Sequence, residues 1–177
     1  MAGEFQQAKR PISALLAGPY GHPYHPILVT IPIGVWVASF IFDIASRVVS
    51  GPAFLAQGSE WLIAVGVIGA LIAASVGFLD LLVIPKGTTA FRIALIHMAL
   101  NLTVTVAYAA NFLWRLGDYA HSGGVEGGMI LLSGVSLAVL ALSGYLGGKL
   151  SYHYGVRVAD EATQAEGYVK SPPNSAV

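Results

Sequence analysis

The sequence has 177 residues, of which 55% are hydrophobic and only 10% are charged, and its formal net charge is zero. An ordinary soluble domain carries about a quarter charged residues, so this composition, with a mean hydropathy of +0.70, indicates a protein of the lipid bilayer. The balanced charge lacks the basic surface of a nucleic-acid-binding protein, and we expect no nucleic-acid partner. The absence of Cys excludes disulfides, Cys-ligated iron–sulfur clusters and covalently attached c-type haem.

Four stretches are apolar over about 20 residues or more, the length that a helix needs to cross a bilayer. They cover residues 26–49, 61–84, 91–114 and 129–150. The predicted fold is all-α: a polytopic membrane protein with four transmembrane helices in an up-down-up-down bundle. We expect this transmembrane domain at 26–150, between an N-terminal segment, 1–25, and a tail, 151–177, that is largely disordered after about residue 160. No internal repeat is apparent.

Basic residues predict the orientation of the bundle. Four spans place both termini on one side, here called the near face, and the opposite side is the far face. The near-face segments carry seven basic residues, whereas the far-face segments carry only Arg47 and Arg115. The positive-inside rule therefore predicts that both termini are cytoplasmic.

Small and polar residues indicate how the helices face one another. Gly69, Ala73 and Gly77 recur every four residues in the second span, a pattern that lets helices approach closely and is compatible with a homo-oligomer. In the third span a polar stripe lies on one helical face and should point into the bundle. Its members are His97, Asn101, Thr105 and Tyr108. Such a stripe either hydrogen-bonds helices together or lines a pathway for protons or small solutes.

Two carboxylates lie within the predicted spans. Asp43 stands four residues before Arg47, and Arg115 lies at a similar depth on the third span. The spacing of four residues favours an ion pair of Asp43 with Arg47 at the membrane interface. Asp80 ends the second span, where Lys86 or Arg92 could neutralise it. A structural ion pair and a functional carboxylate are both open for Asp80.

Four of the five histidines fall at the near face. His22 and His25 lie in a Gly-His-Pro-Tyr-His-Pro turn before the first span, His97 lies inside the third span, and His153 follows the fourth. His121 is on the far face. Imidazole binds Zn, Cu, Fe and Ni, so the sequence predicts a metal site formed by His22, His25, His97, His153 and Asp80. A non-covalent haem b, held by His97 opposite His25 or His153, is an alternative to a first-row transition metal ion.

Several of these segments resemble a bacterial membrane family, domain of unknown function 2231. They are the run from His22 to Trp36, Gly77-Phe-Leu-Asp80, His97-Met-Ala-Leu-Asn101, and the run from Gly147 to Val156. The family has no assigned activity. Its association with Rieske-type and cytochrome modules implies a redox setting, the bacterial inner membrane, and a separate redox protein as partner.

Besides a pathway for protons or small solutes through the third span, two functions stay open. In the first, the chain binds a metal or haem in a redox role within the lipid bilayer. In the second, it is a cofactor-free scaffold or assembly subunit, and the histidines form a polar cap. We find no catalytic motif, which favours a binding or electron-transfer protein over an enzyme.

Overall fold

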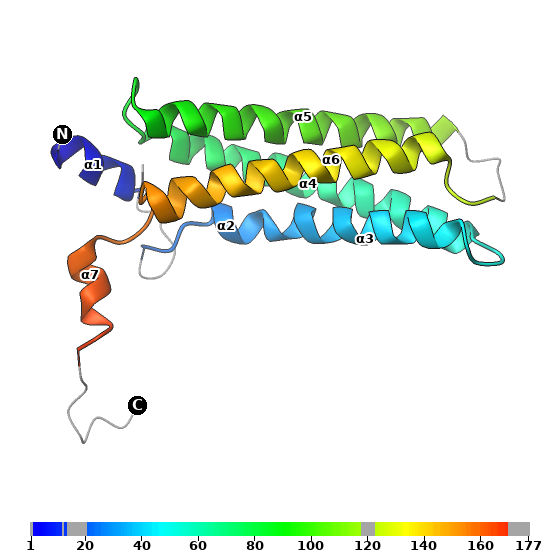
Figure 1. Cartoon of the computed structure of the whole chain (residues 1–177), viewed down its shortest axis with the longest axis horizontal. Coiled ribbons are helices and arrows are strands. Elements are labelled where there is room, and N and C mark those ends of the chain that lie inside the picture. The colour runs from blue at the N-terminus through cyan, green and yellow to red at the C-terminus, as the bar shows by residue number, and fades with distance from the viewer. Residues whose placement is uncertain (1, 12, 14–20, 118–122, 170–177) are drawn as a thin grey trace, which may run out of the picture.

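The computed structural model describes residues 2–11, 13, 21–117 and 123–169, which contain helices and no β-strand. In Figure 1 the long helices lie side by side, and the short helices labelled α1 and α7 lie at the same end of the bundle. The elements in chain order are α1 (Ala2–Lys9), α2 (His25–Leu28), α3 (Thr30–Ser46), α4 (Ala53–Leu82), α5 (Thr89–Gly117), α6 (Gly127–Gly148), the π-helical turn η3 (Lys149–His153) and α7 (Glu161–Glu166).

The four predicted spans are confirmed. Within the described residues, four helical segments are long and apolar enough to cross a membrane: His25–Ser46, Ala53–Leu82, Thr89–Leu116 and Gly127–His153. The second begins well before residue 61, where hydropathy alone had placed its start. The reason is that Ser59 and Glu60, which interrupt the apolar run, are buried inside the bundle and continue the helix.

Contacts between the helices fit an up-down-up-down bundle. Neighbours in the chain pack together, and α3 also packs against α6, so that α3 and α5 are diagonal partners. His25, at the start of the first span, hydrogen-bonds Ala73 late in α4, whereas Asp43, late in α3, contacts Ser59 early in α4. These two contacts show that α3 and α4 are antiparallel.

The first span is broken between α2 and α3. The irregular residue is Val29, which lies one turn before Pro32. Proline has no N–H to donate to the carbonyl four residues before it, and the interruption falls beside that carbonyl, on Leu28. Ile33 N resumes the ladder by donating to Val29 O over 3.3 Å. The break gives His25 its own short helix.

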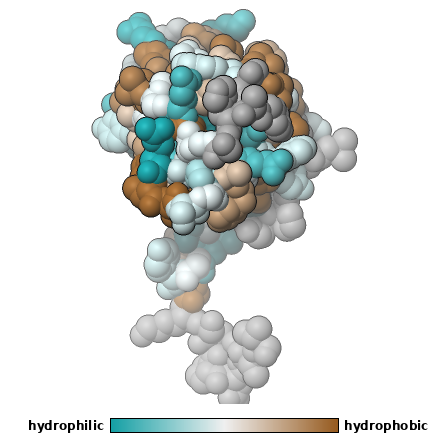
Figure 2. All heavy atoms as spheres, turned by 90° about the vertical axis from the view of Figure 1, so that its right-hand side faces the viewer, coloured by the Kyte–Doolittle hydropathy of each residue, from teal (hydrophilic) through white to brown (hydrophobic). Residues whose placement is uncertain are grey.

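The surface of the bundle is apolar, and its interior holds polar groups. Large aliphatic side chains such as Ile68, Leu71 and Leu131 face outward. Figure 2 views the far face end-on, and hydrophilic residues (teal) stand there among hydrophobic ones (brown). Because hydrocarbon tails are as apolar as these side chains, close packing and hydrogen bonds must hold the helices together.

The two ends of the chain meet at the near face. Arg157 N donates to Ala8 O over 3.0 Å, and Lys9 Nζ lies 3.3 Å from Ala159 O. In the tail that was expected to be largely disordered, Asp160 caps α7 by accepting from Thr163 N over 2.9 Å. This hydrogen bond lowers the pKa of the Asp160 carboxyl, because it stabilises the charged form.

Candidate functional site at the near face

Three pairs of side chains from the diagonal partners face each other across the described bundle. His25 and His97 form the near-face pair, with ring centroids 6.4 Å apart. Trp36 and Tyr108 form the central pair, stacked at 4.2 Å with an interplanar angle of 9°. Asp43 and Arg115 form the far-face pair, joined by two hydrogen bonds of 2.8 and 2.9 Å. Each pair also binds α4 or α6, so these contacts tie the helices together at three levels.

The near-face pair is held by backbone carbonyls. His25 Nδ1 lies 2.9 Å from Ala73 O on α4, and His97 Nδ1 lies 2.8 Å from Ser143 O on α6. A carbonyl oxygen only accepts, so each Nδ1 carries the proton and each Nε2 of the neutral ring keeps a lone pair. The two rings are nearly perpendicular, at 86°.

Glycines make room for both imidazoles. A Cβ placed on Gly77 would lie 2.8 Å from His25 Cε1, and one on Gly147 would lie 3.0 Å from His97 Cε1. A real Cβ essentially never comes as close as 2.8 Å, and 3.0 Å is tighter than nine in ten real Cβ contacts, so a side chain at either position would press on the ring. The small residue at position 77, predicted as part of a packing stripe, therefore seats a histidine.

The polar stripe on α5 points into the bundle, as predicted. Asn101 Nδ2 donates to His97 O over 2.9 Å and lies 3.1 Å from His97 Nε2. Thr105 Oγ1 donates to Asn101 O over 2.8 Å, and Tyr108 is fully buried. Asn101 is the side chain that covers the open nitrogen of His97.

Asp80 has a partner that the sequence did not indicate. Lys86 and Arg92 were the expected cations, but the salt bridge forms with Arg157, whose Nε lies 2.8 Å from Asp80 Oδ1. The Arg157 side chain is 6% exposed, and among the described residues its Nη2 has no hydrogen-bond acceptor. Its backbone has a φ of 59°, a conformation that is uncommon outside glycine. Asp80 also lies within electrostatic range of His25.

The remaining predicted ligands do not complete a metal cluster. His22 is half-buried just before α2. His153 is exposed at the end of η3, with its ring 4.8 Å from that of Tyr154. In the part of the chain that the structure describes, no three His, Asp or Glu side chains are grouped so that they could hold a metal ion. His121 lies outside the described residues.

The far-face pair differs from our expectation that Asp43 would pair with Arg47. Arg47 is exposed and reaches Val125 O at 3.4 Å, whereas Asp43 is fully buried and binds Arg115. Ser59 donates to Asp43 Oδ1, and Arg115 Nε donates to Asn111 Oδ1 over 2.9 Å. This ion pair has most of its hydrogen-bonding capacity filled, which is the condition for a tolerable buried charge.

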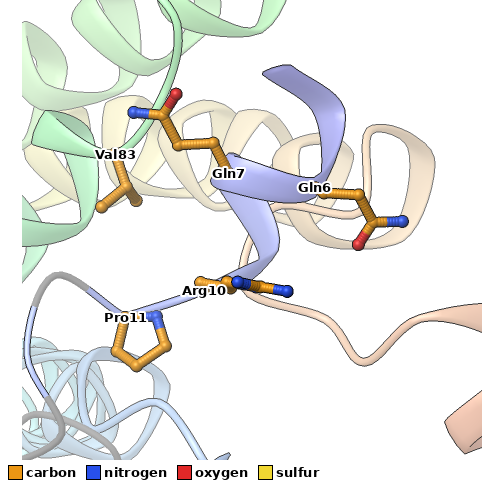
Figure 3. A pocket seen from close by; sticks show the side chains of 5 residues that line it. All are labelled: Gln6, Gln7, Arg10, Pro11 and Val83. Atoms are coloured by element: carbon orange, nitrogen blue, oxygen red, sulfur yellow. The ribbon is translucent and has the colours of Figure 1, made fainter. Parts of the chain in front are cut away.

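A separate hollow of about 310 Å³ lies beneath α1 at the near face. Figure 3 shows its lining, which comes from the N-terminal segment and the end of α4: Gln6, Gln7, Arg10, Pro11 and Val83. The lining has one cation and no carboxylate or imidazole. It therefore has no donor set for a metal, and we leave it outside the candidate site.

Sequence reasoning missed the residues that position the histidines. The accepting groups at Ala73 and Ser143 are backbone carbonyls, which leave no trace in residue type. Arg157 lies 77 positions after Asp80, and its side chain gives no sign of the strained backbone that carries it. One available signal was the pairing of Gly77 and Gly147 with histidines at similar depth.

A comparison with protein families agrees with this architecture. A family model described as "Predicted membrane protein (DUF2231)" matches residues 21–160, which include the near-face pair, Asp80 and Arg157. No curated protein and no solved structure matches the chain. The resemblance seen in the sequence is thereby confirmed, and the chain belongs to the family of predicted membrane proteins DUF2231.

Proposed function

We propose that this protein binds a transition-metal centre in the membrane, in a redox role, and that His25 and His97 are its ligands. The observation that carries the proposal is the pair of Nδ1 bonds to the carbonyls of Ala73 and Ser143. Metal-ligating histidines almost always donate their second nitrogen to a carbonyl, carboxylate or water, which fixes the ring and its tautomer.

The donor set favours haem iron over a bare ion. A protein-bound zinc ion ordinarily takes three or four protein ligands, and the described residues offer two imidazoles and no third group beside them. Haem iron needs only axial ligands, because the porphyrin supplies the other four. A bound haem would supply one-electron chemistry at the near face.

The other near-face groups take supporting roles in this proposal. Asn101 donates to His97 O, and its amide lies over the His97 ring, which helps to fix the position of that ring. Asp80 and Arg157 place a balanced charge pair at the same end of the bundle as His25. His22 and His153, nearer the surface, stay candidates for the approach of a separate redox protein.

The orientation is part of the same proposal. The basic residues of the near face predict cytoplasmic termini in a bacterial inner membrane. Electrons would then enter and leave on the cytoplasmic side. The described residues hold no second histidine pair at the far face, where the facing residues are an Asp and an Arg.

Elemental analysis and visible spectroscopy of the detergent-purified chain test the function. Protein made with haem and metal salts supplied should carry about one metal centre per chain, and His97→Ala should lose it. Thr103→Ala is a matched control, since Thr103 is exposed on the outer face of the same helix. A wild-type chain without metal or haem would refute the proposal.

A cofactor-free scaffold is the second candidate, and the far-face pair favours it. Asp43, Ser59, Asn111 and Arg115 join three helices without any ligand, and Asn111 Nδ2 reaches α6 through Ser133 Oγ at 2.9 Å. A scaffold would keep its partners when His97 is replaced. Co-purification of the same proteins with wild type and His97→Ala, in the absence of any bound metal, would support it.

A further inference from the structure

The two halves of the bundle repeat each other, although no repeat was apparent in the sequence. In the near-face, central and far-face pairs alike, the residue from α5 stands 72 positions after its partner in the first span. Two more buried positions of α3 keep the same interval, Pro32 with Val104 and Ser39 with Asn111. A constant interval over five positions means that the two helices present corresponding faces to the centre.

The second helix of each half follows the same rule with an interval of 70. The carbonyls that accept from the near-face pair belong to Ala73 and Ser143. Those that accept from the central pair belong to Ile63, bound by Trp36 Nε1, and Ser133, bound by Tyr108 Oη, each at 3.4 Å. Both halves thus use equivalent carbonyls for equivalent side chains.

Glycine contacts repeat as well. The glycines under the near-face pair, Gly77 and Gly147, are 70 positions apart. Near the far face, Gly58 lies under Phe42 and Gly128 lies under Trp114, so that the glycines again differ by 70 and the aromatic residues by 72. The chain is therefore two helical hairpins, α2–α4 and α5–η3, related by a pseudo-two-fold axis along the bundle.

Parallel repeats of this kind are related by an axis normal to the membrane. The three facing pairs lie across this axis, and they have diverged in different ways. The central pair has become Trp with Tyr, and the far-face pair has become Asp with Arg. Only the near-face pair is the same residue twice.

Identical histidines do not complement each other as Asp and Arg do. Each Nδ1 donates to a carbonyl, so the Nε2 of each neutral ring keeps its lone pair, and the ring centroids are 6.4 Å apart. The amide of Asn101 lies over the His97 ring, with Nδ2 3.1 Å from Nε2 and 3.4 Å from Nδ1, and the counterpart of Asn101 72 positions earlier is Val29, which offers no side-chain donor. An electrophilic centre between the rings would satisfy both nitrogens.

We infer that the near-face pair is one symmetric site on the pseudo-two-fold axis, which binds a single metal centre through one imidazole from each repeat. This inference rests on the proposed function and adds the requirement that both repeats contribute equally. The ligand class is a metal centre that takes two imidazole nitrogens, either haem iron or a bare ion such as copper. A symmetric site of this kind excludes a metal site built from one histidine of the pair together with Asp80 or His153.

Matched substitutions in the two repeats test the symmetry. The full chain in detergent is loaded with haem in one set of samples and with copper in another. Binding is followed by visible and electron paramagnetic resonance spectra and by metal content. His25→Ala and His97→Ala should each weaken binding by about 100-fold or more, and Gly77→Ala and Gly147→Ala by about 10-fold, because ligand and supporting residues are both needed.

The far-face glycines provide the control. Gly58→Ala and Gly128→Ala introduce the same methyl group at equivalent positions of the repeat, away from the histidines, and should leave binding unchanged. Circular dichroism verifies that every variant keeps its helices. Added imidazole should restore the spectrum of His25→Gly and of His97→Gly, since a free ring can enter the vacated position.

The outcomes separate this inference from the proposed function. Equal losses in the two repeats, with either haem or copper, support the symmetric site, and the probe that binds identifies the centre. A wild type that binds while one of the two histidine variants binds equally well overturns the symmetric site and that histidine's assignment as a ligand, and leaves the proposed metal-binding role of the chain standing. A wild type that binds neither haem nor copper overturns both.

Discussion

The near-face and far-face pairs each join equivalent positions of the two repeats, at opposite ends of the bundle, and they solve opposite problems. At the far face, Asp43 and Arg115 carry opposite charges, are almost fully buried, and satisfy each other directly. At the near face, His25 and His97 are half-buried and identical, and each is satisfied by a carbonyl of the neighbouring helix. The far-face pair holds the helices together, whereas the near-face pair leaves two nitrogens for a ligand.

This difference teaches where stability and function reside in the bundle. Removing one partner of a buried ion pair is strongly destabilising, because the remaining charge stays buried without a counter-ion or water around it. A histidine bound to a carbonyl contributes only one ordinary interhelical hydrogen bond. Substitutions at the two ends should therefore separate folding from ligand binding.

The largest effect is expected at the far face. Arg115→Met leaves the Asp43 carboxylate buried without its cation and should destabilise the bundle by about 3–5 kcal/mol. Unfolding of the detergent-solubilised chain in increasing SDS, followed by circular dichroism, measures this loss. The control is Arg47→Met, which removes an exposed cation from the same face. Equal stability of the two variants would contradict the assigned role of the ion pair.

A smaller loss is expected where the chain ends meet the bundle. Arg157→Met removes the cation that forms the salt bridge with Asp80, a partly exposed carboxylate, and should cost about 1–3 kcal/mol. Lys86→Met and Arg92→Met should be neutral, because Asp80 pairs with neither. The same SDS titration distinguishes them. If Lys86→Met were the damaging change, the expectation drawn from the sequence would hold in place of the observed salt bridge.

Substitutions in the near-face pair should change the stability of the ligand-free chain only slightly. In the ligand-free chain, His97→Leu removes the bond to Ser143 O and should cost about 1 kcal/mol. Binding of haem or copper should nevertheless be abolished. A loss as large as that of Arg115→Met would mean that the histidines are structural, and would remove the contrast between the two faces.

The smallest effect concerns α7. The folded state lowers the pKa of Asp160, so its cap contributes above the ordinary pKa of the carboxyl and is lost as the pH falls through the lowered value. Asp160→Asn should retain most of the cap at acidic pH, and Asp160→Ala should fray α7 at every pH. Amide exchange of Thr163 N, which donates to Asp160, reports both. Neither change should alter binding at the near face.

The sequence predicted what depends on neighbours along the chain. Apolar length predicted four spans, and a spacing of four residues placed His97, Asn101 and Thr105 on one inward face. The alternation of spans predicted that the candidate ligands lie together at the near face, and two of them, His25 and His97, have ring centroids 6.4 Å apart. These inferences need only helical periodicity and the alternation of spans.

Pairing between distant helices could not be predicted in the same way. A helix that is apolar on every side, as α4 largely is, does not indicate which face turns inward. The choice of Arg115 over Arg47 for Asp43, and of Arg157 over Lys86 for Asp80, depends on that rotation. The repeat could not be predicted from the sequence, because few residues are identical at the intervals of 72 and 70 and because the two intervals differ.

The position of His25 at the very beginning of the first span has an electrical consequence. Moving one charge across the whole membrane is worth about 2.3 kcal/mol per 100 mV of membrane potential. A centre at the near face that exchanges electrons with a partner on the same side crosses only a small part of that field. For the proposed metal centre, reduction should therefore respond little to the membrane potential, because the electron exchange would stay on one side of the membrane.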